Sequence, residues 1–381
     1  MGHAERRVLI VAGERSGDAH AARLVAELRA LGDCRVRGVT GPALEHEGAE
    51  RIVAMDELAV LGFSAVLARL PRLFAAYRRI LDEARRWKPD VCVLVDAPGF
   101  NLRLGPQLKR LGLRVVYYIA PQVWAWHPER ARAMAAWVDE LAVVFPFEEP
   151  LFHDAGVRAT FVGHPLLDAL APEVDEATLR AELELEPGAR IVGLLPGSRA
   201  QELQHHTPAL LGAAAMLGRE RSDFAFVVAH PSVPGLADGR VDDAHAAHGA
   251  RVRVVRGRTH AVQAFAVAAA VASGTASLET ALFGTPLAIV FRTGRLNFAI
   301  ARRLVTLKRI GLPNIVAGED VAPELIQGAC QPERIAAALA PWLDDPRAHA
   351  EQVAKLARVR AALGEPGAAR RAAARVWEHL A

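Results

Sequence analysis

One segment combines a carboxylate with a rigid turn in a way that suits acid–base chemistry. Asp96 follows the hydrophobic run VCVLV and precedes Pro98 and Gly99 in the sequence DAPGFN. A carboxylate at the carboxyl end of a strand can remove a proton from a hydroxyl group bound there. It can equally cap the next helix, and the spacing alone does not choose between the two roles.

A glycine-rich segment, AGERSGD, connects an early hydrophobic run to a helical pattern. Gly13 and Gly17 permit close approach of the backbone, and the amides there could receive an anion or a sugar hydroxyl. The segment is neither a Walker loop nor a GxGxxG motif. A plain turn with Ser16 or Asp18 as the N-cap is the alternative.

Two further turns between strand and helix suit a diphosphate. In LPGSR, Gly197 and Ser198 stand beside Arg199, so helix amides and a guanidinium could share the charge, although a cap made by Glu202 explains the same residues. SGTASLET, Ser273 to Thr280, offers small residues followed by a carboxylate. Its candidate ligand-binding residues are Ser273, Gly274, Thr275 and Glu279, although Glu279 taken without the neighbouring motifs is an ordinary helix residue.

The segment YYIAPQVWAWHPERARAM places Trp124 and Trp126 beside basic residues. A core position is the default for large aromatic side chains. The histidines His20, His127, His164, His205 and His206 show no metal-ligand spacing such as HExxH, so no metal site is predicted.

The segments described above lie between hydrophobic runs and helical patterns, so the strands and helices formed by these must position them. The alternation of such runs and patterns predicts parallel sheets covered by helices. The fold class is therefore α/β, with two Rossmann-like, doubly wound domains facing a cleft at the carboxyl ends of their strands. The expected divisions are an N-terminal domain at 1–170, a linker at 171–190, a C-terminal domain at 191–345 and C-terminal helices at 346–381.

Composition narrows the class of protein. The net charge is +3 and the 46 basic residues are almost all arginine, which is weak evidence for an anionic partner. No zinc finger or RNP-type motif is present, so nucleic acid is disfavoured. No apolar stretch is long enough to span a membrane, no signal peptide is recognised, and three cysteines lie far apart, so a cytoplasmic location is expected.

AGERSGD, DAPGFN, PQVWAW, LPGSR, SGTASLE and LPNIVAGEDVAPELIQ, in this order, resemble the lipid-A-disaccharide synthase family over essentially the whole chain. The resemblance implies a GT-B, UDP-sugar-dependent transferase of lipid A, and hence lipopolysaccharide, biosynthesis. Its donor would be UDP-2,3-diacylglucosamine, its acceptor 2,3-diacylglucosamine 1-phosphate, and its product a β-1,6 disaccharide formed with inversion. The sequence has no DxD triplet, the usual means by which a transferase binds a divalent ion at the diphosphate, so no metal and no cofactor are expected.

Carried over by residue, the resemblance makes Asp96 the catalytic base, with Asp18 as its main rival. The implied donor-binding residues are Gly197, Ser198, Arg199, Ser273, Gly274, Thr275, Glu279 and Asn314. The implied acceptor- or sugar-binding residues are Gly13, Ser16, Gly17, Asp18, Asn101, Gln122 and Trp124. Arg15 and Gly99 depart from the family pattern, and Gly99 leaves Asp96 as the only carboxylate of its motif.

A basic amphipathic stretch at residues 58–80 is expected to contact the anionic surface of the inner membrane, to which the enzyme would attach peripherally. An ordinary helix packed on the sheet is the alternative, and Pro71 is expected to end or kink the helix. The contact residues are Phe63, Leu67, Arg69, Leu70, Arg72, Phe74, Arg78 and Arg79.

Two other classes of protein stay open. Another UDP-GlcNAc enzyme, either a peptidoglycan transferase or a hydrolysing 2-epimerase, would share the phosphate turns but not DAPGFN together with PQVWAW. A non-catalytic nucleotide-binding protein of the membrane surface would not need Asp96. Acyl-chain length is not predicted, and the oligomeric state stays open, with a homodimer among the alternatives.

Overall fold

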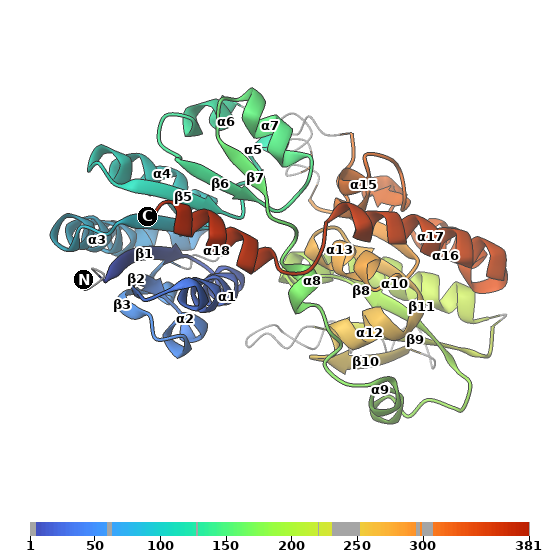
Figure 1. Ribbon diagram of the computed structural model, residues 1–381. Coiled ribbons are helices and arrows are strands. Elements are labelled where there is room, and N and C mark those ends of the chain that lie inside the picture. The colour runs from blue at the N-terminus through green and yellow to red at the C-terminus, as the bar shows by residue number, and fades with distance from the viewer. Residues whose placement is uncertain are drawn as a thin grey trace. The chain divides into compact units, whose positions relative to one another are not determined.

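The computed structural model describes residues 5–58, 63–126, 129–219, 221–230, 252–294, 298 and 308–380, with the backbone alone at 63–70 and 125–126. The chain forms two compact units (Figure 1). The N-terminal unit comprises Met1–Asp168 and Gly364–Ala381, and the C-terminal unit comprises Ala169–Leu363. Residues 346–381 were expected to form separate C-terminal helices, whereas Gly364–Ala381 belong to the N-terminal unit.

A seven-stranded parallel sheet forms the centre of the N-terminal unit, in the order β3-β2-β1-β4-β5-β6-β7. Its strands are β1 (Arg6–Ala12), β2 (Cys34–Thr40), β3 (Glu50–Ala54), β4 (Val91–Val95), β5 (Arg114–Tyr118), β6 (Glu140–Val143) and β7 (Ala159–Phe161).

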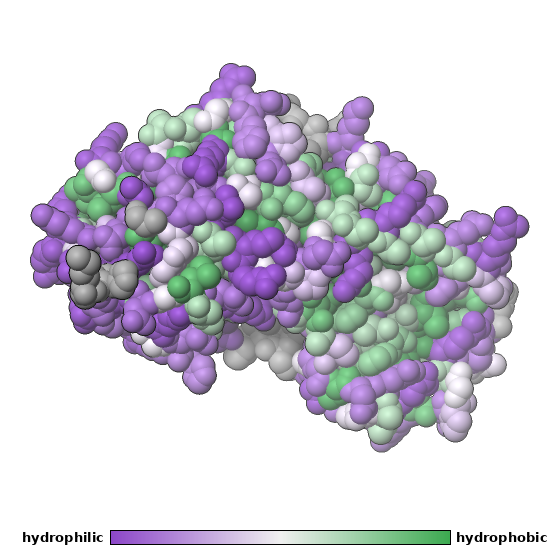
Figure 2. All heavy atoms as spheres, viewed as in Figure 1, coloured by the Kyte–Doolittle hydropathy of each residue, from purple (hydrophilic) through white to green (hydrophobic). Residues whose placement is uncertain are grey.

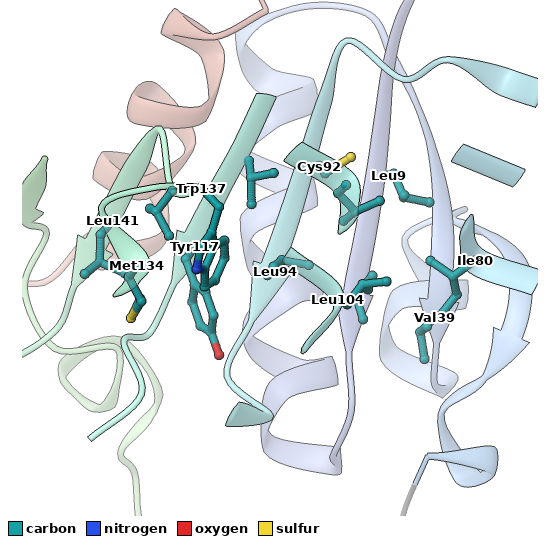
Figure 3. Packing of buried hydrophobic residues seen from close by; sticks show 14 of the residues in the cluster. Leu9, Val39, Ile80, Cys92, Leu94, Leu104, Tyr117, Met134, Trp137 and Leu141 are labelled. Carbon is teal, nitrogen blue, oxygen red and sulfur yellow. The ribbon is translucent and has the colours of Figure 1, made fainter. Parts of the chain in front are cut away.

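Helices cover both faces of this sheet. The helices are α1 (Arg15–Leu31), α2 (Pro42–His46), η1 (Met55–Glu57), α3 (Phe63–Trp87), α4 (Pro98–Arg110), α5 (Val123–Trp126), α6 (Glu129–Met134), α7 (Glu148–Asp154), α8 (Leu166–Ala169) and, from the chain's end, α18 (Ala368–Glu378). Helix α18 packs on α1. On the other face, Ile80 of α3, Leu104 of α4 and Met134 of α6 close a core against Leu94 and Tyr117 of the sheet (Figure 3).

The C-terminal unit repeats the plan with six parallel strands in the order β10-β9-β8-β11-β12-β13. The strands are β8 (Arg190–Leu195), β9 (Phe224–His230), β10 (Val252–Arg256), β11 (Ala266–Ala272), β12 (Leu287–Phe291) and β13 (Glu324–Ile326). The helices are α9 (Glu176–Glu182), α10 (Ala200–Gly218), α12 (Thr259–Phe265), α13 (Thr275–Leu282), α15 (Leu312–Ala317), η2 (Gln327–Ala329), α16 (Pro332–Asp344) and α17 (Pro346–Ala362).

The strand order fixes where ligands can bind. In the N-terminal sheet the order in which strands are added reverses between the parallel neighbours β1 and β4, and in the C-terminal sheet it reverses between the parallel neighbours β8 and β11. Loops after the strands on either side of such a switch point diverge and leave a crevice. AGERSGD follows β1, DAPGFN follows β4, LPGSR follows β8 and SGTASLET follows β11. The four motifs therefore occupy the two switch points.

The predicted α/β fold class is confirmed, and the hydrophobic run VCVLV forms the central strand β4. Strands β2, β3, β7 and β13 were missed, because CRVRGVT and ERIVA interleave charges and the other two have only three residues. Pro71 was expected to end or kink the helix, and α3 continues through it, so the helix does not end there. A proline removes one backbone donor, and its fixed φ is compatible with a helix.

Hydrophilic side chains cover most of the N-terminal unit on the face shown in Figure 2, interrupted by small hydrophobic areas. Among the residues that the structure describes, no helix is both long and apolar enough to cross a bilayer.

Candidate functional site

Asp96 and Ala97, directly after β4, both have left-handed backbone conformations, with φ of 48° and 47°. Such conformations are unfavourable for residues other than glycine and persist only where the surroundings hold them. The amide of Asp96 donates to the carbonyl of Tyr118 (3.1 Å). The carbonyl of Asp96 accepts from Tyr117 Oη (2.6 Å) and Asn101 Nδ2 (2.8 Å). These three hydrogen bonds fix the direction in which the carboxylate leaves the sheet.

The surroundings of Asp96 favour proton uptake. Burial raises the pKa of this carboxyl, and the neighbouring Glu14 carboxylate raises it further, against a smaller opposing effect of the Ala97 amide. A base whose pKa lies closer to the working pH accepts a proton more readily from a substrate hydroxyl. The structure therefore gives Asp96 the electrostatic character expected of a general base.

The glycine-rich loop contacts this turn directly. A Cβ atom on Gly13 would lie 2.7 Å from the Cβ of Ala97, and one on Gly17 would lie 4.0 Å from the Cβ of Asp96. Glu14, Arg15 and Ser16 are exposed where α1 begins, and α1 has no side-chain cap. Ser16 is therefore free of the capping role that the sequence left open for it.

Asp18 has a structural partner that the sequence did not predict. Its side chain is 3% exposed, and its carboxylate accepts from the amides of Gly41 (2.8 Å), Ala43 (2.9 Å) and Leu44 (3.3 Å). Asp18 thus caps α2, a helix distant in sequence, and not its own helix. These bonds occupy the carboxylate and do not favour either a sugar-binding role or a base at this position.

Asn101 and Trp124, both expected to bind acceptor, are buried. Asn101 donates from Nδ2 to the carbonyls of Val95 (3.3 Å) and Asp96, so its side chain stabilises the backbone of the Asp96 turn. Trp124 donates from Nε1 to Glu148 Oε1 (2.9 Å) and packs edge-on against Phe147. The core alternative for Trp124 agrees with this environment, whereas Gln122, two residues earlier, is exposed.

Glu148 is a buried carboxylate that was not predicted from the sequence. This carboxylate is fully buried, and its Oε2 accepts from the amides of Phe145 (3.1 Å) and Val144 (3.3 Å). Burial raises its pKa to about 7 despite these bonds and the bond from Trp124. The signal was available, because Glu148 closely follows the strand LAVV at the same sheet edge as Asp96.

In the C-terminal unit, Glu202 occupies the turn LPGSR. Its Oε2 accepts from the amides of Ser198 (2.9 Å) and Arg199 (3.2 Å), and its Oε1 pairs with the Arg199 guanidinium (2.7 Å). Gly197 has φ of 107°, and a Cβ there would meet the Glu202 carboxylate. The capping alternative is therefore present. Arg199 is nevertheless 81% exposed, so its remaining donors face solvent.

Residues near the start of the turn after β11 are exposed to solvent. Gly274 and Thr275 are exposed, Gly274 has φ of 141°, and the Ser273 hydroxyl donates to the carbonyl of Ile310 (3.1 Å). Glu279 lies on α13, where His260 Nε2 is 3.7 Å from its Oε2. The nearby Glu279 carboxylate is the main cause of the raised pKa of His260.

Asn314 is 1% exposed, and its side chain is fully engaged within the protein. Its Oδ1 accepts from the amides of Val321 and Ala322, and its Nδ2 donates to the Ala322 carbonyl and to Glu324, all at 2.8 Å. An amide side chain has no further hydrogen bond to offer a nucleotide. Asn314 shapes the LPN turn and is not placed to bind ligand with these atoms.

The basic stretch on α3 is described only in its second half. Arg72, Phe74 and Arg78 are exposed, with Phe74 at 55%, and Arg78 lies over the Phe74 ring. Arg79 forms an ion pair with Glu57, with 2.9 Å between Nη1 and Oε2. The side chains of Phe63, Leu67, Arg69 and Leu70 lie outside the described residues. Within the described part, no group of histidine, cysteine and carboxylate side chains is arranged to hold a metal ion.

Comparison with known sequences supports one family. A family model described as lipid-A-disaccharide synthetase matches residues 8–376. A lipid-A-disaccharide synthase of Geobacter metallireducens is 41% identical over 377 residues, covering 98% of this chain and 97% of the relative. One from Syntrophus aciditrophicus is 43% identical over 369 residues, covering 96% of both.

Solved structures resemble the fold. A UDP-GlcNAc 2-epimerase from Neisseria meningitidis bound to UDP-GlcNAc aligns with a TM-score of 0.65 at 13% identity, covering 98% of each chain. The calicheamicin glycosyltransferase CalG4 aligns with a TM-score of 0.58 at 18% identity, covering 99% of each. At such identities the likeness concerns the two-domain α/β architecture.

Proposed function

Because the chain belongs to the lipid-A-disaccharide synthase family, a family of glycosyltransferases, we propose that it joins two diacylated glucosamine units. The donor is UDP-2,3-diacylglucosamine, the acceptor is 2,3-diacylglucosamine 1-phosphate, and UDP is released. The observation that carries the mechanism is the Asp96 carboxylate, held at the switch point between β1 and β4 with a raised pKa.

Asp96 takes the proton from the 6-hydroxyl of the acceptor as that oxygen attacks the anomeric carbon of the donor. The new C–O bond forms as the bond to the UDP oxygen breaks, and attack opposite the leaving group gives a β-1,6 linkage from an α-linked donor. An alcohol is a weak nucleophile, so a base at this position contributes directly to the rate. The left-handed turn supports this role because hydrogen bonds to the Asp96 amide and carbonyl fix the direction in which its side chain leaves the backbone.

The donor diphosphate is assigned to the switch point between β8 and β11. Arg199 supplies an exposed guanidinium, and Gly274 and Thr275 supply exposed backbone at the start of α13. The amides of Ser198 and Arg199 become available to a phosphate only when the Glu202 carboxylate leaves them. Cationic and amide groups of this kind neutralise the leaving UDP without a metal ion. Turnover should therefore survive EDTA, and loss with EDTA that magnesium restores contradicts this part.

The deciding experiment measures UDP release from the diacylated donor with and without the lipid acceptor, and the anomeric configuration of the product. Acceptor-dependent release with a β-linked disaccharide supports the proposal. Acceptor-independent hydrolysis or C2 epimerisation of UDP-GlcNAc supports the 2-epimerase alternative instead. Binding of UDP without any release identifies a non-catalytic protein.

Peripheral attachment to the inner membrane follows from the same substrates, and α3 is the proposed contact. Arg78 lies over the exposed ring of Phe74, Arg72 is exposed on the same helix, and a basic surface with an apolar side chain binds anionic bilayers. The variant R72S/R78S should float less with anionic liposomes, and its remaining binding should depend less on salt. R85S/R86S, at the other end of α3, is the matched control because Arg85 and Arg86 pair with Asp82 and Glu83. Equal flotation of both variants contradicts the proposal.

A further inference from the structure

His206 joins two loops at the carboxyl edge of the C-terminal sheet. Its side chain is 1% exposed on α10. Nδ1 lies 2.7 Å from the carbonyl oxygen of Pro196, and Nε2 lies 2.9 Å from the amide nitrogen of Arg292. A carbonyl only accepts and an amide N–H only donates, so the ring is neutral and carries its proton on Nδ1.

The two loops lie on different sides of β11. Pro196 begins the turn that continues into Gly197, Ser198 and Arg199, which follows β8. Arg292 begins the segment that follows β12. Strand β11 lies between β8 and β12 in the sheet. His206 therefore spans the strand whose own loop, SGTASLET, completes the proposed donor site.

The segment after β12 forms one wall of a pocket of about 380 Å³. Arg292, Thr293 and Gln327 line it together with His205, the chain neighbour of His206. Gln327 holds the segment from the other side, since its Oε1 accepts from the Thr293 amide (3.3 Å) and its Nε2 donates to the Thr293 carbonyl (3.2 Å). Two side chains thus fix this wall through its backbone.

We propose that His206 is a positioning residue that holds the Arg292 segment at a set distance from the LPGSR turn, so that both contact one sugar-diphosphate donor. The inference rests on the proposed function. The lining fits such a ligand, because an arginine and a histidine favour anionic oxygen and Thr293 suits a hydroxyl group. The sequence analysis considered His206 only as a metal ligand, and a buried ring with two backbone partners has no free nitrogen for a metal.

Two substitutions each remove one end of the bridge. Asparagine extends about as far as Nδ1, so His206→Asn can still donate to Pro196 but loses the acceptor for Arg292. Glutamine extends about as far as Nε2, so His206→Gln can still accept from Arg292 but loses the donor to Pro196. Both side chains are neutral, as the histidine is, so neither introduces a buried charge.

His349 offers a matched control in the same unit. It lies on α17, and its Nε2 is hydrogen-bonded to the carbonyl of Val267 (3.1 Å), near the start of β11 and away from the carboxyl edge. His349→Asn therefore removes a histidine–backbone bond of the same kind without touching the loops. A general loss of stability would appear in the control as well.

The test measures the donor KM, kcat and UDP dissociation constant of the full chain, with thermal melts to establish folding. Loss of a hydrogen bond that positions a charged group predicts a rise of about 10-fold in donor KM and UDP Kd for both His206 variants, with kcat within about 3-fold and H349N unchanged. Q327A, which releases the same segment from its other side, should raise donor KM similarly, and it decides the matter if both His206 variants unfold.

Unchanged donor KM and UDP Kd in folded H206N and H206Q, or an equal rise in H349N, overturns the positioning role. A wild-type chain that releases no UDP from the diacylated donor overturns the proposed function instead, so the two failures are distinct. A change in kcat alone would also overturn the inference, because it would place His206 with the chemical step and not with donor binding.

Discussion

The switch points of the two sheets have similar glycine-rich loops but differ in the charged group that they carry. The N-terminal one holds a carboxylate without a cationic partner among the described residues, and the C-terminal one holds an exposed guanidinium. Between β1 and β4, Asp96 is partly buried, lies near a second carboxylate and has no cationic partner among the described hydrogen bonds and ion pairs. Between β8 and β11, Arg199 is exposed and paired with Glu202.

The difference matches two tasks. A carboxylate kept away from cations, with a raised pKa, is prepared to accept a proton. An exposed guanidinium beside helix amides is prepared to receive an anion from solvent, and it remains charged at any working pH. The same α/β plan can therefore supply a base in one unit and an anion site in the other, through the residues placed after four strands.

The largest expected effect comes from Asp96→Asn. Asparagine keeps the shape of the side chain but cannot accept the proton, so turnover should fall about 10²- to 10⁴-fold. The UDP dissociation constant should stay unchanged, because the donor is assigned to the other unit. Steady-state kinetics and calorimetric titration with UDP measure both. Near-normal turnover in Asp96→Asn together with collapse in Asp18→Asn would move the base to Asp18.

The same variant should be more stable than the wild type. The folded pKa of Asp96 is raised, so the folded state binds its proton more tightly than the unfolded state does, and this carboxylate destabilises the fold as the pH rises through that pKa. Asparagine removes the charge and also tolerates a positive φ. Thermal melts at neutral pH should show a higher Tm for Asp96→Asn, and a lower Tm contradicts the assigned environment.

Arg199→Ala tests the other side of the comparison. Loss of a charge-assisted contact to a phosphate should raise the donor KM and the UDP Kd on the order of 10- to 100-fold. The Tm should change little, because the side chain is 81% exposed. Arg347→Ala, on α17, removes an exposed arginine that also pairs with a glutamate and is the control. Equal UDP affinity in both variants would show that the diphosphate binds elsewhere.

Glu148 predicts a pH-dependent stability confined to the N-terminal unit. With a folded pKa of about 7, this buried carboxyl binds its proton more tightly than in the unfolded chain, so the free energy of unfolding should fall as the pH rises from about 4.5 past 7. The loss is on the order of 3 kcal/mol once the pH is above 7. Glu148→Gln should flatten this slope in urea titrations at several pH values, whereas Glu149→Gln should keep it. An unchanged slope in Glu148→Gln contradicts the assignment.

A pair of glycine variants gives the smallest and most local effect. A methyl group on Gly13 would lie 2.7 Å from Ala97, so Gly13→Ala should displace the Asp96 turn and lower stability by about 1–3 kcal/mol, with reduced turnover. A Cβ on Gly99 has nothing within 4 Å, and this residue lies in α4, so Gly99→Ala should stabilise by about 0.5–1 kcal/mol without loss of turnover. Equal effects of the two changes would contradict the close contact between the loops.

The sequence by itself determined the architecture and the family. Runs such as VCVLV and IVGLL are continuous and apolar because helices cover both faces of a parallel sheet. Such a run can be read from neighbouring residues alone. The small polar residues after those runs are equally local, so the positions of Asp96, Arg199 and Gly274 at sheet edges could be predicted.

Only the tertiary structure decided how several of those residues are used. Asp18 meets amides more than 20 residues away, Trp124 meets Glu148, and Asn314 meets the segment that leads into β13. A side chain that can bind a sugar can bind a backbone amide equally well, because both offer the same donors and acceptors. The choice depends on which group is nearer after folding. Tertiary packing likewise decides that α18 belongs to the N-terminal unit, where it packs on α1.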